Sequence, residues 1–147
     1  MRGRFVVTTF AAICLGTFLT ATPVTQAAQC SNTVVAGSYG YTASGFVLSN
    51  GSFLPVAAAG RIVFDVHGNV IGTQTRVVAG SALNETYSGT YSVNADCRGS
   101  FTVLVQPDTR VSTVDLVWTE NAKGASAVFT TAGFVLTATA RRIAPTE

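Results

Sequence analysis

The chain has 147 residues, of which 48% are hydrophobic and only 11% are charged, and its formal net charge is +2. This length leaves room for one domain after an N-terminal targeting segment. The weak charge argues against nucleic acid or an anionic membrane surface as a partner, because both require clustered basic side chains.

The N-terminal segment reads as a secretory signal peptide. Arg2 and Arg4 precede an apolar run over residues 5–19, and small residues follow up to Ala28. This is the order of a charged head, an apolar core and a cleavage site, and the run is shorter than the roughly twenty residues of a membrane span. We therefore expect residues 1–28 to be a signal peptide of a secreted or periplasmic protein. The mature chain would have no integral membrane span and seven charges of each sign.

Two cysteines remain once Cys14 has left with the signal peptide. In an exported chain, a pair of cysteines predicts one disulfide, between Cys30 and Cys97. This bond would tie the mature N-terminus to the middle of the chain. The loop-entropy model gives a stabilisation of about 4 kcal/mol for a closure of this length.

Residues 29–147 predict a single all-β domain. They are rich in Gly, Thr, Ser, Val and Ala, and no segment shows helical periodicity. Short runs with period-two alternation predict strands, with turn residues between them. Pro55 places its own segment at an edge or a loop, and the last segment bends or breaks near Gly133. In chain order the segments are residues 37–48, 53–57, 60–66, 70–78, 83–93, 97–105, 112–120 and 125–141.

The turn lengths predict the registers of two hairpins. A three-residue turn at residues 94–96 would place Tyr91 opposite Gly99, with both apolar sets on one side of the sheet. A three-residue turn at residues 67–69 would likewise place Phe64 opposite Gly72. Each aromatic ring would then cover a glycine on the partner strand.

About eight strands with short connections predict an antiparallel up-and-down meander. The sequence Gly-Phe-Val-Leu occurs at residues 45–48 and again at residues 133–136. First and last strands that read alike can pair and close the sheet, which removes both edges. We expect a closed barrel, and a two-sheet β-sandwich is the alternative.

Five aromatic side chains are predicted to converge on one face of the sheet. In a small barrel such residues either fill the interior or line a cavity for a ligand. Tyrosines next to glycines leave recesses, and a hydroxyl on an apolar wall is typical of a ligand pocket. The candidate ligand-lining residues are Phe64, Tyr87, Tyr91, Phe101 and Trp118.

No catalytic residue, metal site or cofactor site is assigned. His67 is the only histidine and is placed in a turn, so a zinc site would lack ligands. No nucleophile elbow, phosphate loop or dinucleotide fingerprint is present. The carboxylates considered for acid–base chemistry are interpreted as residues of solvated strand faces: Asp65, Glu85, Asp115 and Glu120.

Residues 89–99, GTYSVNADCRG, resemble the repeat style of small exported bacterial β proteins, most of them without an assigned function. The predicted architecture also resembles the calycin-like barrels, which include lipocalins, avidins and allene-oxide-cyclase-like proteins. That resemblance implies a cavity for a small ligand.

These observations predict an exported, non-catalytic β-barrel that binds a small apolar or amphipathic ligand. One alternative is a structural or adhesive envelope module. Another is a cofactor-free cyclase or isomerase, by analogy with the allene-oxide-cyclase-like fold. The oligomeric state does not follow from the sequence.

Overall fold

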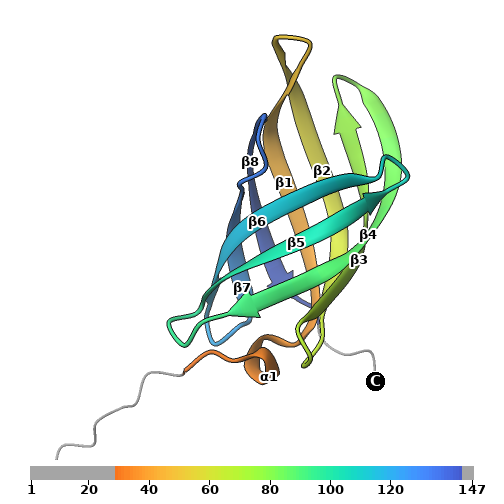
Figure 1. Ribbon diagram of the computed structural model, residues 1–147. Helices are drawn as coiled ribbons and strands as arrows, with labels where there is room; N and C mark the ends of the chain where they lie inside the picture. The colour runs from red at the N-terminus through yellow and green to blue at the C-terminus, as the bar shows by residue number, and fades with distance from the viewer. Residues whose placement is uncertain (1–28, 144–147) are drawn as a thin grey trace, which may run out of the picture.

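Buried and exposed side chains alternate along most of the strands. The strands close on themselves (Figure 1). The computed structural model describes residues 29–143, so the predicted signal peptide, residues 1–28, lies outside the described residues. One helical turn, α1 (Asn32–Val35), precedes the strands. The strands are β1 (Gly37–Ser49), β2 (Ser52–Phe64), β3 (Asn69–Val78), β4 (Ser81–Val93), β5 (Arg98–Gln106), β6 (Arg110–Thr119), β7 (Gly124–Phe129) and β8 (Phe134–Arg142).

The eight strands form a closed antiparallel up-and-down barrel, as predicted. Each strand pairs with the next, and β1 pairs with β8 to complete the barrel. The two Gly-Phe-Val-Leu segments meet at this closure, where Gly45 lies opposite Leu136 and Phe46 lies opposite Val135. The barrel prediction is therefore confirmed, and the sandwich alternative is wrong.

Strand β2 is longer than the sequence pattern predicted. It runs without a break through Pro55, where two separate segments were expected. Pro55 pairs with Phe46 of β1 but lies beyond the last pair that β2 makes with β3, between Val56 and Val78. The β1–β2 hairpin consequently projects beyond its neighbours (Figure 1). A proline is accommodated there because no ladder hydrogen bond to β3 is needed.

The predicted registers of the two hairpins are wrong by two residues. Tyr91 lies opposite Phe101, and Phe64 lies opposite Val70. Five residues separate the last paired positions of each hairpin, in place of the predicted three. A shift of two residues keeps every side chain on its face, so the predicted sharing of one face still holds.

A common loop conformation causes this error. The fourth residue of each loop has a positive φ, 90° at Gly68 and 67° at Cys97. Both loops are closed by the same two backbone hydrogen bonds, for example from Cys97 N to the Asn94 carbonyl and from Asn94 N to the Arg98 carbonyl. A residue in the left-handed region adds a bulge-like step before the second strand begins. Glycine adopts this conformation easily, whereas Cys97 gives no such signal in the sequence.

Aromatic rings do cover glycines, but with other partners than predicted. A Cβ atom added to Gly99 would lie 2.7 Å from Cζ3 of Trp118 and would overlap the Ser92 carbonyl oxygen. A Cβ atom added to Gly72 would overlap the ring of Tyr87, which is its direct partner on β4. The two glycines therefore make room for rings inside the barrel.

The substitution Gly99→Ala tests the packing of the Trp118 ring against Gly99. We expect the free energy of unfolding to fall by about 1–3 kcal/mol, because the added methyl group overpacks the core. Trp118 is the only tryptophan and is 3% exposed, so its fluorescence should shift to longer wavelength as the ring is displaced. The control is Gly40→Ala, where the new Cβ atom would lie 3.6 Å from Ile143 Cδ1. Equal unfolding midpoints and spectra for the two variants would contradict the proposed contact.

Candidate functional site: the barrel interior

The inward-facing side chains surround a cavity along the barrel axis. Its volume is about 80 Å³, as the space open to the centre of a water-sized sphere. One water needs roughly 10–15 Å³ on this measure, so the cavity holds several waters or a narrow organic molecule. The wall is mainly apolar, and its larger apolar side chains include Val56, Ile62, Phe64, Phe101, Val103, Val105, Val114, Leu116, Phe129, Phe134 and Leu136.

The structure separates the five candidate ligand-lining residues into two groups. Phe64, Tyr87 and Phe101 line the cavity. Tyr91 and Trp118 pack edge-on against Phe64, with ring centroids 4.9 and 5.6 Å away, and are not part of the cavity wall. All five side chains belong to the hydrophobic core or pack against it, but only Phe64, Tyr87 and Phe101 also line the cavity.

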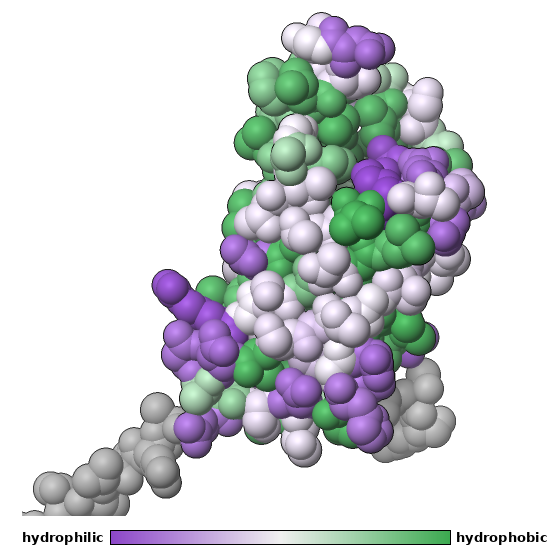
Figure 2. Space-filling model, in the orientation of Figure 1, coloured by the Kyte–Doolittle hydropathy of each residue, from purple (hydrophilic) through white to green (hydrophobic). Residues whose placement is uncertain are grey.

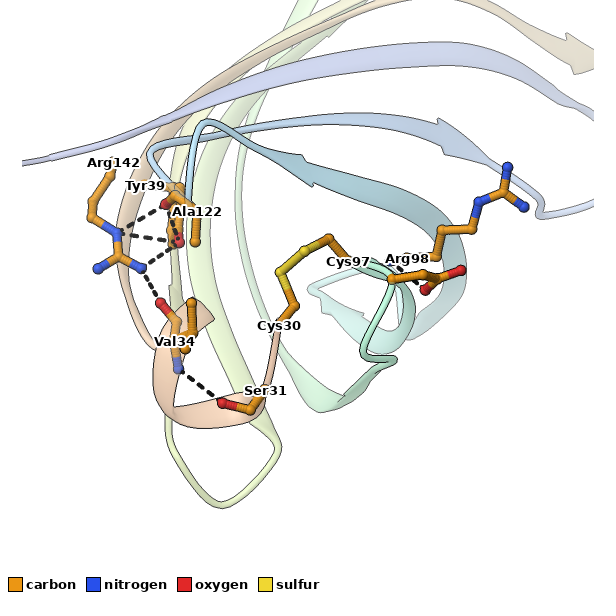
Figure 3. Close-up of a disulfide and its surroundings, with 9 residues drawn as sticks. Cys30, Ser31, Val34, Tyr39, Cys97, Arg98, Ala122 and Arg142 are labelled. Carbon is orange, nitrogen blue, oxygen red and sulfur yellow. Dashed lines mark hydrogen bonds between the residues drawn. A yellow bond between two sulfur atoms is a disulfide. The ribbon is translucent and has the colours of Figure 1, made fainter. Parts of the chain in front are cut away.

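The N-terminal segment closes one end of the barrel (Figure 3). Cys30 is bonded to Cys97 of the β4–β5 loop, as predicted. Val35 of α1 is fully buried within the core cluster. This end is therefore covered by the chain itself and covalently tied to the loop beside it.

Tyr39 and Arg142 hold this cover in place (Figure 3). The Tyr39 hydroxyl lies 2.9 Å from the Val35 carbonyl oxygen and 2.8 Å from that of Ala122, and it accepts a hydrogen bond from Arg142. Arg142 also donates to the Val34 carbonyl at 2.7 Å. Burial raises the pKa of Tyr39, although the bond from Arg142 and its charge oppose the rise. The hydroxyl stays protonated at neutral pH.

A cluster of charged side chains occupies the opposite part of the interior. Glu85 has no exposed side-chain surface. Its Oε1 atom accepts hydrogen bonds from Arg76 Nε at 2.9 Å and Nη2 at 2.7 Å, and from Arg110 Nη2 at 3.3 Å. Asp108, in the β5–β6 turn, bonds the same two guanidinium groups at 3.1 and 3.2 Å. The two arginine side chains are 15% and 21% exposed, so the interior meets solvent at this end.

The pKa of Glu85 is lowered by this arrangement. Burial acts to raise it, but hydrogen bonds from Arg76 and Gln74 and the charges of Arg110 and Arg76 outweigh burial. Glu85 is therefore ionised at neutral pH. Two arginines and two carboxylates make the cluster electrically neutral as a whole.

Two tyrosines extend the cluster towards the apolar wall. The Tyr87 hydroxyl lies 3.2 Å from that of Tyr41, which donates to Gln74 Oε1 at 2.5 Å. Gln74 Nε2 in turn donates to Glu85 Oε2 at 2.5 Å. Burial raises the pKa of Tyr41 to about 12 and raises the pKa of Tyr87 as well. Both hydroxyls are donors at neutral pH, and the Tyr41 hydroxyl orients the amide of Gln74.

The interpretation of Glu85 as a residue of a solvated strand face is wrong. Glu85 is 2% exposed and points inward with Tyr87 and Tyr91. The sequence did contain a signal, because Glu85 continues the period-two series of these tyrosines. Arg76 also points inward, whereas the sequence pattern gave it no interior role.

The other candidate acidic residues lie away from the cavity. Asp115 and Glu120 are exposed, as a solvated face predicts. Asp65 lies in the β2–β3 loop, where hydrogen bonds from the Asn69 side chain and backbone, and from His67 N, lower its pKa. The His67 side chain is 81% exposed. Within residues 29–143, no group of three or more His, Cys, Asp or Glu side chains is placed to hold a metal ion.

In the described part of the chain, no helix is both long enough and apolar enough to cross a membrane. Comparison of the chain with protein family models, with curated proteins and with solved structures found no match. The closed eight-stranded antiparallel barrel is consistent with a calycin-like architecture.

Proposed function

We propose that this protein is an exported, non-catalytic, calycin-like barrel that binds a small apolar or amphipathic molecule in its interior. The observation that carries the proposal is the form of the cavity. An apolar wall leads to one compact cluster of polar groups, and the opposite end is covered by the N-terminal segment. An apolar cavity with a few convergent polar groups is the usual form of a small-molecule site.

The size of the cavity limits the ligand. About 80 Å³ suits a narrow molecule, and a wider one requires ring movement at the end near Arg110. Phe129 and Phe134 stack there, with centroids 6.4 Å apart, and both are only half-buried. Their rotation would enlarge the cavity without disturbing the strand ladder.

The complete hydrogen bonding of the Glu85 carboxylate supports a binding role over catalysis. Each carboxylate oxygen of Glu85 already accepts hydrogen bonds from at least two side chains. The three tyrosines of the cavity wall, Tyr39, Tyr41 and Tyr87, have raised pKa values, so none of them supplies a phenolate at neutral pH. A general base must be free to take a proton from its substrate.

Native mass spectrometry of the mature protein purified from its own compartment tests the proposal, with analysis of the organic extract. We expect a stoichiometric small-molecule adduct. The variant Ala138→Phe, which fills the cavity, should lose the adduct, whereas Ala57→Phe on the outer face of β2 should keep it. An empty wild-type monomer, or an adduct that survives Ala138→Phe, would contradict an interior site.

A second candidate is a structural or adhesive module, and the distribution of charge favours it. Residues 29–60 and 124–140 contain no charged side chain, and they form β1, β7 and most of β2 and β8. Figure 2 shows hydrophobic surface near the projecting hairpin, where four large apolar side chains are exposed: Phe46, Leu48, Phe53 and Val135. An empty oligomer in the same mass spectra would favour this candidate.

A further inference from the structure

The polar cluster next to the cavity offers hydrogen-bond donors and almost no free acceptors. Glu85 accepts bonds from Gln74, Arg76 and Arg110, which occupy both of its oxygens. The Gln74 carbonyl oxygen accepts from Tyr41. A ligand group placed against this cluster therefore gains most if it is itself an acceptor.

One of these donors is buried without a partner. The Nε–H group of Arg110 has no acceptor among the described residues, although Nη1 and Nη2 bond Asp108 and Glu85. Arg110 contributes to the cavity wall, and its guanidinium carbon lies 5.8 Å above the centre of the Phe134 ring. A buried donor without an acceptor costs free energy, which an acceptor on a ligand would recover.

Asp108 lies on the solvent side of the same guanidinium groups. Its side chain is 42% exposed, in contrast to that of Glu85, which is fully buried. The inner carboxylate is thus a permanent part of the cluster, whereas the outer one is partly open to solvent. A second carboxylate arriving from the cavity would share the two arginines with Asp108 and compete with it.

We propose that the cavity selects ligands that carry a carboxylate at their polar end, and that Arg110 receives this carboxylate through its Nε–H group. The apolar part of the ligand would lie along the wall formed by Phe64, Phe101 and Val114. An arginine gives a charged, directional contact to a carboxylate, stronger than a bond to a neutral hydroxyl. This inference rests on the proposed function and specifies its ligand class.

Three probes of equal length test the selectivity: hexanoate, hexanol and hexylamine, titrated into isotope-labelled protein at pH 7 and followed by NMR chemical shifts. We expect hexanoate to bind at least about tenfold more tightly than the other two. Equal affinity for hexanol or hexylamine would overturn the carboxylate preference and leave the interior site standing. Absence of binding by all three would count against the proposed function itself.

The variant Arg110→Lys tests the role of Arg110. Arg110→Lys keeps the charge but removes the Nε–H donor, and should weaken hexanoate binding about tenfold with hexanol changed less than about twofold. Arg98→Lys is the matched control, because Arg98 is exposed at the covered end of the barrel (Figure 3). If Arg110→Lys weakens the binding of hexanoate and hexanol equally, or weakens neither, the role of Arg110 is overturned.

Asp108→Asn provides a test in which hexanoate binding is expected to become tighter, not weaker. Removing the competing outer carboxylate should tighten hexanoate binding several-fold and leave hexanol binding unchanged. Asp96→Asn, in the exposed β4–β5 loop, is the control and should change neither. Weaker hexanoate binding by Asp108→Asn would mean that the two arginines do not receive the ligand.

Discussion

Glu85→Gln is expected to lower the free energy of unfolding by about 3 kcal/mol. Breaking a buried ion pair by removing one partner typically costs about 3–5 kcal/mol, because the remaining charge stays buried without compensation. Here Arg76 and Arg110, at 15% and 21% exposure, would retain only the outer carboxylate of Asp108. Urea unfolding at pH 7 measures the difference.

A matched substitution separates burial from charge. Glu120→Gln removes a carboxylate that lies 3.8 Å from Arg141, and both side chains are more than half exposed. Its effect should stay within about 0.5 kcal/mol, since exposed pairs contribute little. If the two glutamine variants have similar unfolding midpoints, Glu85 does not stabilise the barrel as the contacts indicate.

The pH dependence of stability should differ between the wild type and Glu85→Gln. The pKa of Glu85 in the folded protein is below its ordinary value of 4.5. Its contribution is therefore fully present above that value and is lost as the pH falls through the lower pKa of the folded state. The wild type should lose stability more steeply than Glu85→Gln below about pH 4.5. Parallel profiles would contradict the lowered pKa.

Replacing both Cys30 and Cys97 with serine is expected to destabilise the barrel by about 4 kcal/mol. The bond closes a loop across a sequence separation of 67 residues, and the loss of this constraint lets the unfolded chain expand. This is a large part of the stability of a small domain, which is about 5–15 kcal/mol. The cover should also loosen at residue 30, where the hydrogen bond from its backbone N to the Ala95 carbonyl remains.

Reduction supplies the control for this prediction. Wild-type protein in a reducing buffer should unfold at the same urea concentration as the double-serine variant, and the variant should be insensitive to the reductant. Amide exchange in residues 31–36 should become faster in both. Unchanged unfolding of reduced wild type would show that the bond contributes little to stability.

Face assignment was predictable because it depends only on period-two alternation. Tyr87 and Tyr91 point inward for any odd number of loop residues. The predicted three-residue loop therefore assigned them to the correct face, although the loop has five residues. The closure of β1 on β8 was likewise visible in two matching segments, and the pairing of Cys30 with Cys97 followed from their number. The sequence by itself therefore favoured the barrel over the sandwich, and it determined the inward direction of the tyrosines and the covalent tie.

Only the tertiary structure decided the registers and the polar cluster. The register depends on the backbone of one loop residue, and the positive φ of Cys97 arises from hydrogen bonds that close the loop. Burial of Glu85 depends on Arg76 and Arg110, which lie 9 and 25 residues away in the sequence. Arg76 comes from the neighbouring strand β3, and Arg110 comes from β6, two strands away from β4. A carboxylate is stable inside a barrel only when such partners converge on it, and alternation in one strand carries no information about the next.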